Sequence, residues 1–253
     1  MKIALLQNHI LWENKAANIS RFEETLKAHP GNDLYLLPEM SFTGFSMNTS
    51  LTAESGAETV SKIRQLAAAN RTAIGFGWVR RNDNICENVY TIIGSDGELL
   101  SDYTKIHPFS YSGEDKFFTG GKEISVFELS GIPFSVFICY DLRFPELFRM
   151  VCRQVHAVII PANWPAKRSE HWKALLQARA IENQVYIFAV NCTGDMNALY
   201  YSGDSCVIDP NGEVLLSLSD REGVLEFDFT DDTEQYRKAF PVLQDIKTGF
   251  LFP

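Results

Sequence analysis

Short apolar runs and helix-spaced apolar sets alternate along the chain. A continuous apolar run bounded by turn residues is typical of a buried strand, and apolar spacing of three and four residues is typical of an amphipathic helix. The pattern predicts strands over residues 2–7, 33–37, 72–79, 89–93, 98–103, 125–129, 133–138, 156–160, 185–191, 205–208 and 213–218. It predicts helices over residues 14–28, 54–70 and 169–183, with a further helix opening at 144–146.

Two tetrapeptides with turn chemistry predict hairpins, at 94–97 (GSDG) and 209–212 (DPNG). Helices around mixed strands predict a layered α/β fold, and the late hairpin argues against a purely parallel sheet. No Pro/Gly-rich linker, charge block or low-complexity segment divides the sequence. We therefore expect residues 1–253 to form a single domain.

The composition narrows the classes of partner. Of 253 residues, 45% are hydrophobic and 22% charged, an ordinary globular mixture. The net charge of −9 disfavours a phosphate-binding surface, so we exclude nucleic acid as the main partner. No apolar run approaches the roughly 18 to 20 residues that span a bilayer, and the N-terminus does not resemble a secretory signal. Five cysteines without a C-x-x-C pair suit a reducing compartment, so a cytoplasmic location is expected.

Cys139 occupies the most suggestive position for chemistry. It ends a predicted strand and precedes the segment 140–145 (YDLRFP), which leads into a helix. A side chain at such a turn projects into the crevice at the carboxyl end of the strand, where the positive helix end favours a thiolate. The alternative is a buried cysteine that packs as a small hydrophobe.

Glu39 and Lys105 also lie just after predicted strands, each separated from its strand by one residue. The apolar segment after Glu39 suits a carboxylate that acts as a general base, although a helix-capping or solvated glutamate is the alternative. Lys105 lies among apolar and aromatic residues, so it either extends to water or is a buried cation. A cation beside Cys139 would lower the thiol pKa and stabilise an oxyanion. The three residue types are chemically complementary.

Other catalytic arrangements find less support in the sequence. A Cys–His dyad of Cys139 with His107, His156 or His171 lacks the papain-type context, and no histidine has the late His-x-Glu pattern of glutamine amidotransferases. His156 lies in a predicted buried strand, so we interpret it as a hydrogen-bonded core residue. No G-x-G-x-x-G, P-loop, G-x-S-x-G or H-E-x-x-H motif is present, so neither a cofactor nor a metal is expected.

Three segments resemble, in order, the signature blocks of the nitrilase superfamily of carbon-nitrogen hydrolases: 36–40 (LLPEM), 103–107 (YTKIH) and 138–146 (ICYDLRFPE). Segments 162–165 (ANWP), 177–183 (QARAIEN) and 201–205 (YSGDS) match as well, so the likeness covers essentially the whole chain. It implies a four-layer αββα sandwich, a homodimer or larger assembly, and a triad of Glu39, Lys105 and Cys139. Segments 163–166 (NWPA) and 236–241 (YRKAFP) are most similar to ω-amidases, which hydrolyse 2-oxoglutaramate and succinamate. Nitrile hydrolysis is disfavoured by the same comparison.

The resemblance implies attack by Cys139 on an amide carbon, with Glu39 as general base and a thioester intermediate. At an ordinary pKa near 8.5, a thiol is only about 3% ionised at pH 7. Lowering the thiol pKa to about 7 would raise the thiolate fraction to about one half, a gain of roughly fifteenfold. Oxyanion donors contribute more, roughly 3 to 4 kcal/mol each, and the candidates are Lys105 and the backbone N–H of Tyr140. Glu114 matches a second glutamate of the family, which would orient Lys105 or Glu39; a loop salt bridge is the alternative.

A half-amide substrate needs a cation for its distal carboxylate. The candidates near the signature blocks are Arg143, Lys167 and Arg168, although Arg143 could instead pair with Asp141 or Glu146. The candidates for the rest of the substrate site are Phe109, Tyr111, Asn163, Trp164 and His171.

Other functions remain open at this stage. The same chemistry would suit a deaminated-glutathione amidase, an N-carbamoyl amide hydrolase, a general aliphatic amidase or acyl transfer to an amine. A catalytically inactive interaction scaffold would have no need of Glu39, Lys105 and Cys139 together. The expected reactants are a small amide and water, without a cofactor.

Overall fold

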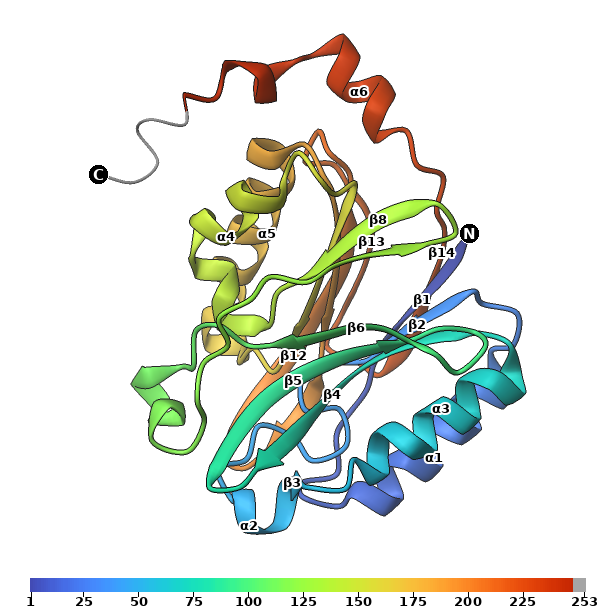
Figure 1. Cartoon of the computed structure of the whole chain (residues 1–253), viewed down its shortest axis with the longest axis vertical. Coiled ribbons are helices and arrows are strands. Elements are labelled where there is room, and N and C mark those ends of the chain that lie inside the picture. The colour runs from blue at the N-terminus through green and yellow to red at the C-terminus, as the bar shows by residue number, and fades with distance from the viewer. Residues whose placement is uncertain (248–253) are drawn as a thin grey trace.

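The computed structural model describes residues 1–247, and two mixed sheets packed face to face form its centre (Figure 1). The first sheet consists of β1 (Lys2–Gln7), β2 (Leu34–Leu36), β3 (Ala53–Glu54), β4 (Ala73–Asn82), β5 (Ile85–Ile93), β6 (Leu99–Thr104) and β14 (Gly223–Asp228). Its order is β14-β1-β2-β4-β5-β6, with β3 beside β4. Strands β1, β2 and β4 run parallel, so the segments that follow them leave the sheet at one edge.

The second sheet has the same mixed character. It consists of β7 (Val126–Leu129), β8 (Ile132–Val136), β9 (Ala157–Ala162), β10 (Tyr186–Asn191), β11 (Thr193–Met196), β12 (Leu199–Ile208) and β13 (Val214–Ser219). Its order is β11-β12-β10-β9-β8-β7, with β13 beside β12. Strands β8, β9 and β10 are parallel, and antiparallel hairpins complete the sheet.

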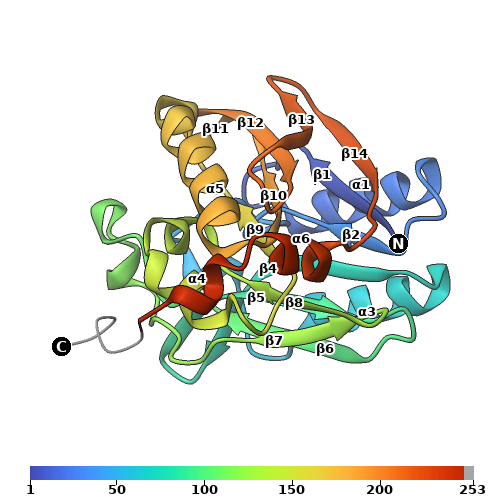
Figure 2. The same cartoon turned by 90° about the horizontal axis from the view of Figure 1, so that it is seen from above.

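Helices cover the outer face of each sheet (Figures 1 and 2). The α-helices are α1 (Lys15–Ala28), α2 (Thr49–Thr52), α3 (Glu58–Asn70), α4 (Pro145–Val151), α5 (Ser169–Asn183) and α6 (Thr233–Ala239). Helices α1 and α3 lie on the first sheet, and α4 and α5 lie on the second. Short 3-10 helices are η1 (Ser110–Ser112), η2 (Glu114–Lys116), η3 (Cys139–Arg143), η4 (Ala166–Arg168) and η5 (Val242–Asp245).

The period-2 alternation of strand side chains produces two separate cores. On β1, Ile3 and Leu5 join the core between the sheets, whereas Ala4 and Leu6 join the core under α1 and α3. All four side chains are buried. The layers therefore follow the order αββα, and the four-layer sandwich expected from the sequence is confirmed.

Several boundaries differ from the sequence-based predictions. The helix predicted from residue 54 begins at Glu58, because Ala53–Glu54 pair with β4 as a short strand. The chain after Cys139 forms a 3-10 helix, and the α-helix begins only at Pro145. Strands β11 and β14 and helix α6 were not predicted, because β11 is short and largely polar and β14 alternates only weakly.

The segment 236–241 anchors the C-terminal part of the described chain. The Arg237 guanidinium on α6 donates to the carbonyls of Cys152, Val155 and Gln184 at 2.8 to 3.1 Å. These bonds fasten the C-terminal segment to the ends of α4 and α5, where Figure 2 shows α6. Within residues 1–247, no helix has the length and apolar character needed to cross a bilayer.

Candidate active site

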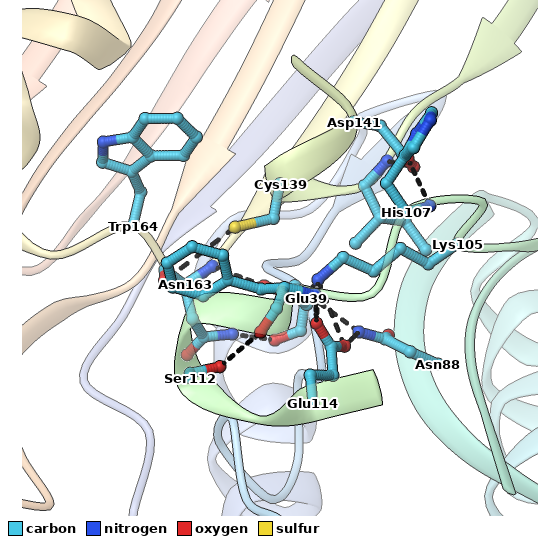
Figure 3. Close-up of polar contacts among 12 residues, drawn as sticks. Glu39, Asn88, Lys105, His107, Ser112, Glu114, Cys139, Asp141, Asn163 and Trp164 are labelled. Atoms are coloured by element: carbon cyan, nitrogen blue, oxygen red, sulfur yellow. Dashed lines mark hydrogen bonds and ion pairs between the residues drawn. The ribbon is translucent and has the colours of Figure 1, made fainter. Parts of the chain in front are cut away.

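The structure brings the predicted catalytic side chains together where several strands end (Figure 3). Glu39 lies in the turn after β2, and Lys105 follows β6 directly. Cys139 follows β8 and begins η3, while Glu114 begins η2. The two sheets thus contribute different members of one cluster.

Lys105 is a fully buried cation held between two carboxylates. Its Nζ donates to Oε1 of Glu39 at 2.8 Å and to Oε2 of Glu114 at 2.9 Å. Burial alone would lower the pKa of Lys105, but the charges of Glu114 and Glu39 raise it well above its ordinary value. The lysine is 1% exposed, so it does not extend to water. It therefore stays charged inside the protein.

Asn88 on β5 completes this cluster. Its Nδ2 donates to Oε1 of Glu39 at 2.8 Å and to Oε1 of Glu114 at 3.0 Å. Burial, followed by the charge of Glu39, raises the pKa of Glu114, while Lys105 opposes the rise. The backbone N–H of Phe109 also donates to Glu114, which ties the η1–η2 loop to the site. The ion pair of Glu114 with Lys105 is thus part of a buried network that includes Glu39, unlike the loop salt bridge considered as the alternative.

Asn163 connects the carboxylate of Glu39 with the thiol of Cys139. Its backbone N–H donates to Oε2 of Glu39 at 2.9 Å, and its side-chain amide donates to the Glu39 carbonyl. Its own carbonyl lies 4.0 Å from Sγ of Cys139, and the thiol of Cys192 donates to its Oδ1 at 3.2 Å. Asn163 was expected to bind substrate and lies in the wall of the cavity beside Cys139, and its hydrogen bonds also position Glu39.

The backbone at Cys139 has a φ of +47°, in the left-handed region that costs a non-glycine residue roughly 1–2 kcal/mol. The buried carboxylate of Asp141 stabilises this turn. It accepts from the Ile138 N–H at 3.1 Å, the Tyr103 hydroxyl at 2.8 Å and the His107 N–H at 2.9 Å. The His107 ring also contacts Asp141, and no hydrogen bond within residues 1–247 joins that ring to Cys139.

The thiol of Cys139 is less acidic than the sequence led us to expect. Burial, and then the charge of Glu39, raise its pKa well above the ordinary value, and Lys105 offsets only part of the rise. Lys105 does lower the thiol pKa as predicted, but the predicted net lowering of that pKa is wrong. Two carboxylates outweigh one ammonium, and the chain begins η3 in place of the expected α-helix. A protonated thiol needs a base, and Glu39 is beside it.

The backbone N–H of Tyr140 lies in the first turn of η3. N–H groups in a first turn have no partner within their helix, so this donor remains available beside Cys139. Its expected role as an oxyanion donor stays a prediction. Within residues 1–247, no three His, Cys, Asp or Glu side chains gather as a metal site.

A cavity of about 210 Å³ opens beside Cys139. It is smaller than the roughly 300–1,000 Å³ of pockets for drug-sized ligands, which fits a small amide. Among the expected substrate-site residues, the cavity wall includes Phe109, Arg143, Asn163, Trp164 and Arg168. The cavity wall also includes residues that were not predicted to bind substrate, among them Trp12, Phe45, Met47, Asn197, Leu199 and Tyr201.

Three expected substrate-site residues lie outside this wall. Tyr111 is 82% exposed because η1 turns it away from the site. Lys167 is exposed on η4, whereas its neighbour Arg168 faces the cavity. His171 is exposed, and its Nδ1 accepts from Nη2 of Arg143 at 3.3 Å. Proximity to a signature block in the sequence did not determine side-chain direction.

Arg143 and Arg168 place two cations at the cavity. The Arg143 guanidinium lies 4.7 Å from the ring centre of Trp164, and that of Arg168 lies 5.3 Å from Phe109. Burial and the neighbouring Arg168 lower the pKa of Arg143. Within residues 1–247 neither arginine pairs with a carboxylate, so the alternative ion pair of Arg143 with Asp141 or Glu146 does not form.

A model of the carbon-nitrogen hydrolase family matches residues 2–238. The chain belongs to this family. It is 34% identical to 2-oxoglutaramate amidase of Bacillus subtilis (strain 168) over 253 residues, with 97% of each chain covered. It is 32% identical to omega-amidase YafV of Escherichia coli (strain K12) over 248 residues, covering 97% of this chain and 96% of the relative.

Solved structures agree with this assignment. A CN-hydrolase superfamily protein of Xanthomonas campestris, with an arsenic adduct in its active site, superimposes with a TM-score of 0.92 at 32% identity, covering 98% and 97% of the two chains. An amidase of Nesterenkonia sp. gives a TM-score of 0.87 at 25% identity, covering 98% and 94%. The resemblance to the nitrilase superfamily and to its ω-amidase-like branch is thus confirmed, and so is the expected class of carbon-nitrogen hydrolase.

The raised thiol pKa of Cys139 predicts a protonated resting nucleophile. A group whose pKa is raised keeps its proton until the pH exceeds that value, so we expect no thiolate at Cys139 between about pH 6 and about pH 8.5. The ultraviolet thiolate absorbance of the wild type minus that of Cys139→Ala isolates this residue from the other four cysteines. A difference signal that develops around neutral pH would contradict the prediction. Unfolded protein, which should titrate normally, serves as the control.

Proposed function

We propose that this chain is an ω-amidase that hydrolyses the terminal amide of a dicarboxylate half-amide, such as 2-oxoglutaramate or succinamate. The products are the dicarboxylate and ammonia. The observation that carries the proposal is the buried Glu39–Lys105–Cys139 cluster beside a small cavity with two arginines that have no carboxylate partner among residues 1–247. The names of the relatives in Bacillus subtilis and Escherichia coli support the same substrate class.

The first half-reaction forms a thioester. Sγ of Cys139 attacks the amide carbon while the carboxylate of Glu39 accepts the thiol proton. Negative charge develops on the amide oxygen, where Nζ of Lys105 and the Tyr140 N–H donate to it. Preorganised donors of this kind contribute roughly 3 to 4 kcal/mol each, more than thiol ionisation could. The tetrahedral intermediate then collapses, and Glu39 returns its proton to the departing ammonia.

The second half-reaction hydrolyses the thioester. Glu39 removes a proton from water, the hydroxide attacks the thioester carbon, and the same donors stabilise the second oxyanion. Collapse releases the carboxylic acid and returns the proton to Sγ of Cys139. Glu114 acts as a supporting residue, because its carboxylate orients the Lys105 ammonium and, through Asn88, the Glu39 side chain.

Arg143 and Arg168 bind the distal carboxylate of the substrate in this proposal. Each guanidinium lies over an aromatic ring, which limits its motion; Nη2 of Arg143 also contacts His171, and its remaining N–H groups can bind a ligand. Guanidinium and carboxylate pair through two parallel hydrogen bonds, so the arginines would fix the length and orientation of the bound chain. Trp164 and Phe109 would then form the walls of the channel between the two ends.

We also propose a domain organisation, an oligomeric state, a location and a set of partners. The family model covers residues 2–238, which supports a single domain. Membership of the carbon-nitrogen hydrolase family supports a homodimer or larger assembly, as the sequence resemblance implies; a purely monomeric species in sedimentation velocity would contradict it. A thiol nucleophile suits a reducing compartment, so we propose a cytoplasmic location.

The net charge of −9 disfavours binding to the anionic surfaces of nucleic acid and of membranes. We therefore propose a small amide and water as the partners.

The proposed activity predicts ammonia release from 2-oxoglutaramate and succinamate, and its loss in Cys139→Ala. The panel should also contain glutamine, an N-carbamoyl-β-amino acid and an uncharged aliphatic amide, which represent the related amidase activities. Hydrolysis of the carbamoyl compound alone would retain the cluster and reject the ω-amidase assignment. Equal activity of wild type and Cys139→Ala would reject the mechanism, and inactivity toward every amide would favour an interaction scaffold.

The two arginines predict a charge-dependent effect on substrate binding. Arg143→Gln and Arg168→Gln should each raise the KM for a half-amide by about ten- to a hundredfold, because a charge-assisted bond is lost. The KM for an uncharged amide of similar length should change by less than about twofold. Lys167→Gln, at an exposed position outside the cavity, is the matched control and should leave both values unchanged. An equal rise for the charged and the uncharged amide would contradict the clamp.

A further inference from the structure

Tyr201 on β12 carries a hydroxyl group without a protein partner. Its side chain is 3% exposed and forms part of the cavity wall. Within residues 1–247, the hydroxyl takes part in no hydrogen bond, and the recorded side-chain contact to Tyr201 reaches its carbonyl. The hydroxyl is not among the fully enclosed polar atoms that lack a partner. It therefore reaches open space, and the open space beside Tyr201 is the cavity.

The other buried tyrosines of residues 1–247 behave differently. Each donates its hydroxyl proton to a protein oxygen: Tyr35 to His29, Tyr90 to Leu37, Tyr103 to Asp141 and Tyr186 to Asp232. A buried phenol without a partner loses roughly 1–3 kcal/mol relative to a satisfied one. The Tyr201 hydroxyl is the exception among these tyrosines, which indicates that it donates to a ligand.

Tyr201 shares the cavity wall with Cys139 and with Arg168. A ligand that extends from the thiol to the arginine therefore passes along the same wall as the Tyr201 side chain. Burial raises the pKa of the Tyr201 hydroxyl, so the phenol stays protonated and acts as a donor.

The ring of Tyr201 is held in place before any ligand binds. It packs in a small core with Ile10, Cys192 and Met196, and Trp12 lies against this core. The β11–β12 hairpin, whose turn residues Asn197 and Ala198 have positive φ, brings this part of the chain to the cavity. A preorganised donor loses little conformational entropy on binding.

We propose that Tyr201 determines specificity by donating its hydroxyl proton to a ketone oxygen next to the distal carboxylate of the substrate. The inference rests on the proposed ω-amidase function. With the amide carbon at Cys139 and the carboxylate at the arginines, the 2-oxo oxygen of 2-oxoglutaramate is the one polar atom left between the ends. The carboxylate oxygens already have charged donors in Arg143 and Arg168, whereas the ketone has none.

The test compares Tyr201→Phe with the wild type on two amides of equal chain length, 2-oxoglutaramate and glutaramate. They differ only in a ketone in place of a methylene group. We expect kcat/KM for 2-oxoglutaramate to fall about tenfold, the loss of one hydrogen bond, and kcat/KM for glutaramate to change by less than about twofold. Tyr200→Phe is the matched control, because the Tyr200 hydroxyl is exposed and bonds Asp220; it should leave both values unchanged.

An equal loss on both amides would overturn the inference, because the hydroxyl would then bind a part that the two share. No loss on either amide would overturn it as well. Wild type that hydrolyses neither amide would instead reject the proposed function. If the variant does not fold, inhibition of the wild type decides: 2-oxoglutarate should inhibit about tenfold more strongly than glutarate, and equal inhibition would contradict the inference.

Discussion

The buried ion cluster of Lys105 with Glu39 and Glu114 is the constraint on which the rest of the structure depends. Each buried charge loses several kcal/mol of hydration, and removal of one partner leaves another charge unpaired. The cluster is stable because Asn88 and the Asn163 N–H satisfy the remaining carboxylate oxygens. These groups come from both sheets and from the loop before η2, so only the complete sandwich assembles them.

The same cluster explains how the nucleophile works. Burial and two carboxylates raise the pKa of the Cys139 thiol well above its ordinary value, so we expect no free thiolate in the resting protein. In the proposed mechanism, reactivity arises only when a substrate carbonyl lies where Glu39 can take the thiol proton and Lys105 can stabilise the oxyanion. The strained turn at Cys139, stabilised by Asp141, holds Sγ next to Asn163 and thus near the base. This arrangement favours chemistry on a bound amide over unspecific thiol reactions.

Continuous apolar runs predicted most strands, and residues placed directly after them predicted Glu39, Lys105 and Cys139, because strand ends converge. Asn88 and Cys192 were not found, since a single polar residue at the edge of a β-rich run carries no signal for its partners. Tyr201 belonged to a segment used only for the family resemblance. The wall formed by β11 and β12 was missed because β11 lacks an apolar run. Lys167 and Arg168 show that adjacent cations can face opposite ways on a 3-10 turn.

The central claim is a thioester on Cys139 that water then hydrolyses. The most direct measurement is partitioning with hydroxylamine, using a half-amide and the methyl ester of the same acyl group as alternative substrates. A shared acyl-enzyme predicts hydroxamate and free acid in the same ratio from both, because both substrates pass through one intermediate. Different ratios from the amide and the ester, or turnover of both without any hydroxamate, would contradict the account.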